Sequence, residues 1–176
     1  MFCDLNQAIV SGEIPECAIV AVGGFPVRRV ESQCYWSIFN KPLVSLSDIE
    51  DYFLEALGLG AVLTFKNPNN KSLRELGKVC LGLGHGWTLH TLTLTVLFHE
   101  VPVAVRNAFA FDRRFHLSWV HNEQSTEKVT FTATGSLKEW KKIGQRATDK
   151  SFHKAQRDWF LTAYDLITPT FPSYFQ

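Results

Sequence analysis

The chain has 176 residues, of which 45% are hydrophobic and 20% charged, as in an ordinary globular domain that buries a core. Its formal net charge of +1 excludes bulk electrostatic attraction to nucleic acid or to an anionic membrane, so phosphate recognition has to be local. The four cysteines lack a Cys-x-x-Cys pair and no apolar run approaches the length of a membrane span. We therefore expect one cytoplasmic domain, residues 1–176, with reduced thiols.

The first half of the chain predicts one strand followed by three helices. The apolar run 18–22 ends at two glycines and predicts a buried strand. Residues 27–37 predict a helix with its aromatic face in the core. Ser-x-x-Glu spacings at 47–50 and 72–75 are capping boxes that start two amphipathic helices, the first of which we expect to end at Gly58.

The second half alternates between strands and helices. Residues 91–98 place leucine, valine and phenylalanine on one face and threonine on the other, which predicts a half-buried strand. Pro102 starts a predicted helix over 103–110. A second threonine-rich strand is predicted over 126–134. A third capping box opens a basic helix, and a last helix over 151–167 buries Ala155 among others. This interleaving predicts an α/β or α+β fold.

Several kinds of chemistry are not indicated by the sequence. The six histidines show neither the His-x-x-x-His spacing around a glutamate nor a neighbouring cysteine, so no metal site is predicted. No Gly-x-Ser-x-Gly elbow and no phosphate-binding or dinucleotide fingerprint is present.

Anion or nucleotide binding has more support. Four arginines offer planar, fork-shaped donors that suit a phosphate or a carbonyl-bearing ring: Arg106, Arg113, Arg114 and Arg146. Asn107, Gln124 and Ser125 add neutral hydrogen-bonding groups. The same residues fit a surface of solvated arginines beside a capped turn, so composition by itself leaves both interpretations open.

The stretch 84–125 contains, in this order, Gly84-His85, a predicted strand, the segment 101–107 and the run Asn122-Glu123-Gln124-Ser125. This succession of motifs resembles the flavin-dependent thymidylate synthases, with weaker similarity at 34–37 and 155–156. It implies a single domain of that fold, a mixed or antiparallel sheet with flanking helices. It also implies a homotetramer whose active sites are shared between subunits.

The resemblance further implies an activity. It is the flavin-dependent methylation, or a related C5 alkylation, of a pyrimidine nucleotide such as dUMP. Methylenetetrahydrofolate would donate the carbon, and FAD reduced by NADPH would donate the hydride. No nucleic-acid or membrane partner is expected.

Site residues carried over from the family fall into three groups. Arg146 matches the catalytic arginine that grips the pyrimidine carbonyl. The substrate-binding residues would be Arg106, Asn107, Glu123, Gln124 and Ser125. The cofactor-binding residues would be His85, Arg113, Arg114, Asn122, Ser136 and His153.

Two departures from the family pattern support other hypotheses. Glu127-Lys128 stands where the family has Arg-Tyr, and a carboxylate there repels phosphate. A helical segment that bears a further phosphate-binding arginine in the family is missing. The second hypothesis is therefore a non-catalytic or repurposed nucleotide- or flavin-binding member of the fold. The third is an unrelated small α/β interaction domain.

Overall fold

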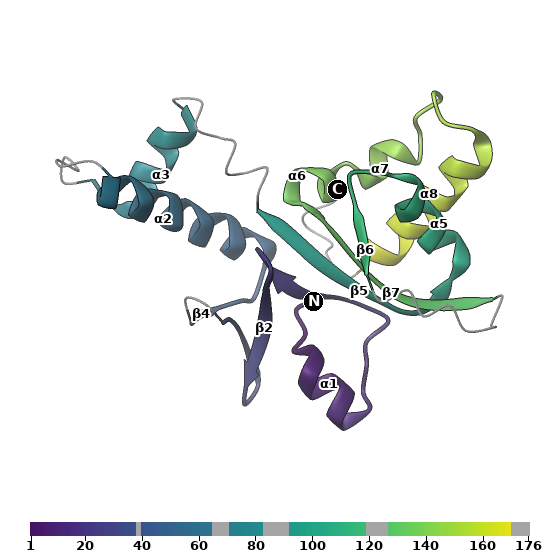
Figure 1. Ribbon diagram of the computed structural model, residues 1–176, viewed down its shortest axis with the longest axis horizontal. Helices are drawn as coiled ribbons and strands as arrows, with labels where there is room; N and C mark the ends of the chain where they lie inside the picture. The colour runs from purple at the N-terminus through teal and green to yellow at the C-terminus, as the bar shows by residue number, and fades with distance from the viewer. Residues whose placement is uncertain (38–39, 65–70, 83–91, 119–126, 170–176) are drawn as a thin grey trace.

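The computed structural model describes residues 1–37, 40–64, 71–82, 92–118 and 127–169 and has one antiparallel sheet flanked by helices (Figure 1). Within these ranges the strands lie in the order β4-β3-β2-β1-β5-β7-β6, and each neighbouring pair is antiparallel. This confirms the α+β class and the antiparallel sheet with flanking helices.

The observed elements match most of the predicted ones. The strands are β1 (Cys17–Val22), β2 (Phe25–Val30), β3 (Gln33–Trp36), β4 (Lys41–Pro42), β5 (Thr93–Pro102), β6 (His116–Ser118) and β7 (Lys128–Ser136). The helices are α1 (Leu5–Ser11), α2 (Leu46–Thr64), α3 (Leu73–Gly82), α5 (Val103–Phe111), α6 (Leu137–Lys141), α7 (Ile143–Arg146) and α8 (Lys154–Ile167). The predicted strand and helix on either side of Pro102 are confirmed. Ala155 on α8 is exposed, so its predicted burial is wrong.

The helix predicted over residues 27–37 is wrong, because this segment forms the β2–β3 hairpin. Val27 pairs with Trp36 across the hairpin, and both side chains are buried in the core. The Trp36 indole N–H donates to the Val22 carbonyl over 3.1 Å, which ties β3 to the end of β1. Packing of alternate side chains on the sheet therefore decides the conformation here, as expected for a segment of weak local preference.

One face of the sheet carries the main core. The predicted inward row Leu92, Leu94, Val96 and Phe98 is buried, which confirms the alternation along β5. Phe98 stacks on Phe131 of β7 at a ring-centroid distance of 5.0 Å and also contacts rings of α5 and α6. Such aromatic pairs add about 0.5–1.5 kcal/mol each beyond the burial of their area.

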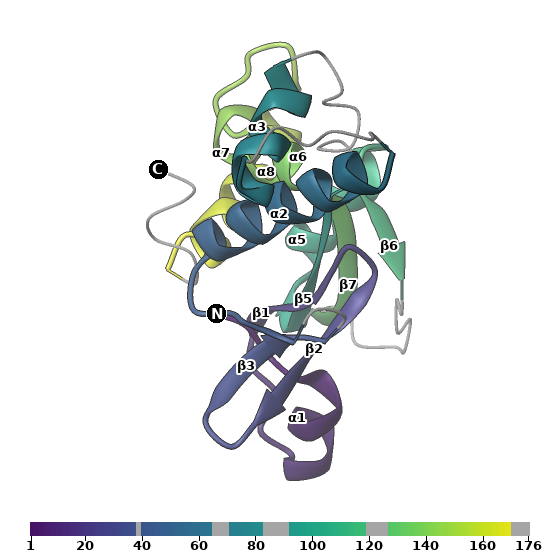
Figure 2. The same ribbon diagram turned by 90° about the vertical axis from the view of Figure 1, so that its left-hand side faces the viewer.

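The helices divide unevenly between the two faces of the sheet. In Figure 1, α5, α6, α7 and α8 gather over one face of β5 and β7, whereas α1 lies apart from them, beside β2. Figure 2 shows α1 at the same end as the β1–β3 strands, away from α8. The face of β5, β7 and β6 that points away from α5–α8 is called the far face below.

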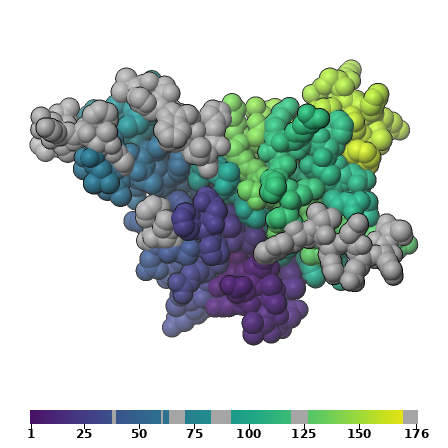
Figure 3. Space-filling model, viewed as in Figure 1, coloured from purple at the N-terminus to yellow at the C-terminus, as the bar shows by residue number. Residues whose placement is uncertain are grey.

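The α2–α3 hairpin extends away from the sheet. Its helices lie at one end of the molecule and α8 at the other, as Figure 3 shows in space-filling form. Gly58 was expected to end the first helix, and that prediction is wrong because α2 continues to Thr64. Gly58 lies against the Leu73 carbonyl of α3, and Gly77 lies against the Leu54 carbonyl of α2. The glycines permit a helix crossing with backbone in contact.

Candidate functional site

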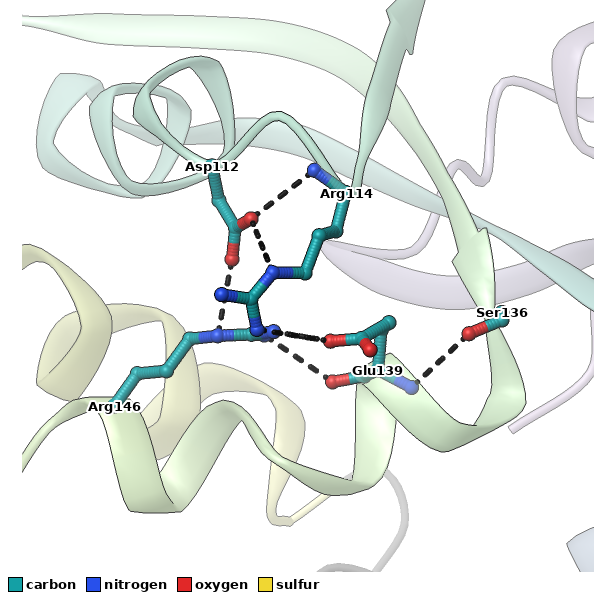
Figure 4. A network of polar contacts seen from close by, with 5 residues as sticks. All are labelled: Asp112, Arg114, Ser136, Glu139 and Arg146. Carbon is teal, nitrogen blue, oxygen red and sulfur yellow. Dashed lines mark hydrogen bonds and ion pairs between the residues drawn. The ribbon is translucent and has the colours of Figure 1, made fainter. Parts of the chain in front are cut away.

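Arg146 lies in a buried network of charges at the junction of three elements. Its guanidinium ion-pairs with Asp112, which follows α5, over 3.0 Å from Nε to Oδ2. Nη2 contacts the carboxylate of Glu139 on α6, and Nη1 donates to the Glu139 backbone carbonyl over 3.3 Å. Only 5% of the Arg146 side chain is exposed. Figure 4 shows the two carboxylates on either side of this guanidinium.

A second arginine completes the network. Arg114 is more than half exposed and lies 3.7 Å from Asp112 and 3.5 Å from Glu139. The ring of Phe115 lies 5.5 Å from the Arg146 guanidinium carbon, within the range of a cation–π contact. The two carboxylates balance the two guanidinium groups. The arrangement therefore fixes α6 and α7 against the end of α5, and Arg146 is held by protein groups rather than presented to solvent.

The environment of Glu139 favours its charged form. Burial acts to raise the pKa of this carboxyl, but the hydrogen bond and positive charge of Arg146 outweigh burial and hold the pKa below its usual range. Because the folded pKa is depressed, the stabilisation is fully present above the unfolded pKa of about 4.3 and is lost as pH falls through the folded value.

We therefore predict that Glu139→Gln loses its destabilising effect in acid. The variant should unfold at lower urea concentration than the wild type at pH 7, because it removes one partner of Arg146. The difference between their free energies of unfolding should shrink as pH falls below about 4.3 and through the lower pKa of the folded wild-type carboxyl. Urea titrations of both proteins from pH 7 to pH 3 measure this difference. A difference that stays constant with pH would contradict the charge network.

Two predicted cofactor-binding residues are helix caps in the structure. The Ser136 hydroxyl accepts from the Glu139 backbone N–H over 3.2 Å at the start of α6, which confirms the forward bond of the third capping box. His153 precedes α8, and its backbone N–H donates to the Gln156 side chain over 3.0 Å. Ser136 thus joins the charge network through Glu139, whereas no hydrogen bond between described residues connects His153 to it.

The remaining predicted site residues lie elsewhere. Arg106 and Asn107 are partly exposed on α5, and Arg113 is exposed just after that helix. A further group lies outside the described residues: His85, Asn122, Glu123, Gln124 and Ser125. The structure thus brings Arg114, Ser136 and Arg146 together. Sequence reasoning missed the partners Asp112 and Glu139, since nothing local indicates that these carboxylates face the same arginine.

The far face carries a row of hydroxyl groups. Strand pairing places Ala21, Thr95, Thr134 and His116 side by side across β1, β5, β7 and β6. The hydroxyls of Thr95 and Thr134 lie 2.9 Å apart. In the next row, the hydroxyls of Ser118 and Thr132 lie 2.6 Å apart. The alternating threonines predicted the strands, but not the hydroxyl pairs formed between them.

These hydroxyl pairs form one wall of a cavity of about 270 Å³, which we call the hydroxyl cavity. Its other walls come from the start of α1 and from β1 and β2. The described residues that line it are Asp4, Leu5, Asn6, Val20, Ala21, Gly24, Pro26, Val27, Thr95, Ser118, Thr132 and Thr134. Polar groups of several elements thus converge on one concave, partly apolar space, the usual character of a small-molecule site.

The described residues contain neither a cluster of metal-ligating side chains nor a helix suited to crossing a membrane. No group of three or more histidine, cysteine, aspartate or glutamate side chains lies close enough to hold a metal ion in that part of the chain. None of the helices there combines the length and apolar character that crossing a membrane requires.

The sequence matches no protein-family model, and no curated protein is significantly similar to it. A function for this chain therefore has to be argued from its own residues and their geometry.

Proposed function

We propose that this chain is a small-molecule-binding protein and that its ligand occupies the hydroxyl cavity. The observation that carries the proposal is the convergence of two hydroxyl pairs, Thr95–Thr134 and Ser118–Thr132, on a cavity that is also lined by apolar residues of β1, β2 and α1. The charge network around Arg146 is a weaker candidate, because its charges already satisfy one another and it holds three helices together.

The hydroxyl pairs keep the capacity to bind a ligand. Each hydroxyl has one proton and two lone pairs, so a bonded pair retains acceptor sites after its mutual bond forms. Thr95, Thr134 and Ser118 are only partly buried, which leaves these oxygens within reach of a molecule in the cavity. A purely structural hydroxyl ladder would not need the adjoining cavity.

Flavin-dependent methylation of a pyrimidine nucleotide is the second candidate function. It would use FAD, with NADPH and methylenetetrahydrofolate as co-substrates, in a homotetramer of the thymidylate synthase fold. The favouring observation is that Arg106 and Asn107 are partly exposed on α5 and Arg113 is exposed beyond it, which suits a phosphate. A repurposed member of that fold would bind the nucleotide or flavin without turnover.

Ligand-induced stabilisation separates the two candidates. The purified protein is heated with FAD, with dUMP, or with a library of uncharged fragments, and hits are located from threonine methyl signals in NMR spectra. We expect uncharged fragments to raise the melting temperature and to shift Thr95 and Thr134. Stabilisation by FAD or dUMP with no change at these threonines would instead favour the second candidate, and turnover with dUMP would then be assayed.

A further inference from the structure

The charge distribution around the hydroxyl cavity restricts what it can bind. Among its described lining residues there is no lysine, arginine or histidine, so a phosphate or carboxylate would find no opposite charge. The one charged group, Asp4, is already engaged: its carboxylate accepts from the backbone N–H of Gln7 over 3.2 Å and from that of Arg29 over 2.9 Å. The cavity therefore disfavours anions.

The hydroxyl wall suits a ligand that both donates and accepts hydrogen bonds. In the Thr95–Thr134 pair either oxygen can be the donor, so this pair can reverse its direction and offer a proton or a lone pair to the ligand. In the other pair the Thr132 hydroxyl donates to the Ser118 backbone carbonyl over 3.2 Å, so the Ser118 hydroxyl donates to Thr132 and offers lone pairs to the ligand. Thr132 and Thr134 are two residues apart on β7, so the pairs are presented about 7 Å apart. Hydroxyl groups at two ends of one ring meet both requirements.

The apolar residues of the cavity suit the face of that ring. Val20, Val27 and Leu5 supply apolar surface from β1, β2 and α1. The register of β1 against β5 shifts between Ile19 and Ala21, and this bulge brings Val20 as well as Ala21 to the cavity. A ring with carbon–hydrogen bonds on its faces and hydroxyls at its edge matches a cavity lined by both apolar side chains and hydroxyl groups.

We propose that the ligand of the hydroxyl cavity is an uncharged, polyhydroxylated six-membered ring, that is, a monosaccharide of the pyranose class. This inference rests on the proposed function and names the ligand class of the same site. Because a monosaccharide is small and would make few polar contacts in the hydroxyl cavity, its dissociation constant should be about millimolar.

Two sugars that share the pyranose ring but differ in charge at one substituent provide the test. D-glucose and D-glucuronate are titrated into protein labelled at threonine methyl groups, and NMR shifts give the dissociation constants. We expect D-glucose to shift Thr95 and Thr134, and D-glucuronate to bind about tenfold more weakly or not at all, because none of the described lining residues offers its carboxylate a positive charge. Thr134→Val should weaken D-glucose binding about fivefold through the lost hydrogen bond.

The matched control is Thr162→Val. Its hydroxyl bonds to the Asp158 carbonyl on the exposed side of α8, so this variant should bind D-glucose as the wild type does. Equal or tighter binding of D-glucuronate, or an unchanged affinity in Thr134→Val, would overturn the sugar proposal. The proposal would also be overturned if no sugar shifted the threonine methyl signals. If uncharged fragments still shift the cavity threonines, the proposed function survives that failure; if no compound shifts them, both proposals fail.

Discussion

Replacing Arg146 with alanine should lower the free energy of unfolding by about 3–5 kcal/mol, the usual cost of removing one partner of a buried ion pair. The loss leaves Asp112, whose side chain is 7% exposed, without its ion pair of 3.0 Å. The Asp112 Oδ2 atom of this ion pair accepts no hydrogen bond from the described residues, so the charge of Arg146 supplies its electrostatic compensation. Urea unfolding followed by circular dichroism measures the change.

Arg114→Ala is the matched control for this experiment. It removes the same type of side chain from the same two carboxylates, but Arg114 is 56% exposed and its ion pairs are long. Exposed pairs contribute about 0–1 kcal/mol, so the control should be nearly as stable as the wild type. Equal stability of the Arg146 variant and the wild type would show that the guanidinium is not structural, which would revive its assignment as the group that grips a substrate.

A methyl group added at Gly77 should push helices α2 and α3 apart. An added Cβ would overlap the backbone of Leu54, and backbone cannot move aside as a flexible side chain can. We expect Gly77→Ala to cost about 3 kcal/mol, at the upper end for overpacking. The hairpin extends from the sheet, so hydrogen exchange should accelerate in α2 and α3 and change little in β5 and β7 (Figure 1).

Gly82→Ala provides the control on the same helix. Outside its own helix and its chain neighbours, no described atom lies within 4 Å of a Cβ at this position, which is the last residue of α3, so alanine fits there without overlap. The control should therefore match or exceed wild-type stability. If Gly77→Ala also leaves exchange in α2 and α3 unchanged, the two helices do not cross with their backbones in contact.

The local patterns of the sequence were sufficient for several elements. The alternation along β5 identified both the strand and its buried face, because successive side chains of a strand point to opposite sides. The Ser72–Glu75 pair identified the start of α3, where each side chain accepts from the other's backbone N–H. These features depend on residues within a few positions of one another.

Other features were decided by packing between distant segments. Residues 27–37 form a hairpin because Val27 and Trp36 are buried against the sheet, and Gly58 lies inside a helix because α3 packs against it. The α+β class could be predicted from the order of elements, but the order of strands in the sheet could not.

The candidate site also combines features that the local sequence predicts with features that only tertiary packing decides. By itself, the sequence determined that the chain is an α+β protein with threonine-rich strands and several arginines. Only the tertiary structure decided which arginine is buried, because Asp112, Glu139 and Arg146 meet through the packing of α5, α6 and α7. It also paired Thr95 with Thr134, 39 residues apart, to form the wall of the hydroxyl cavity. Strand register and helix packing depend on the whole fold, so no local pattern could specify these contacts.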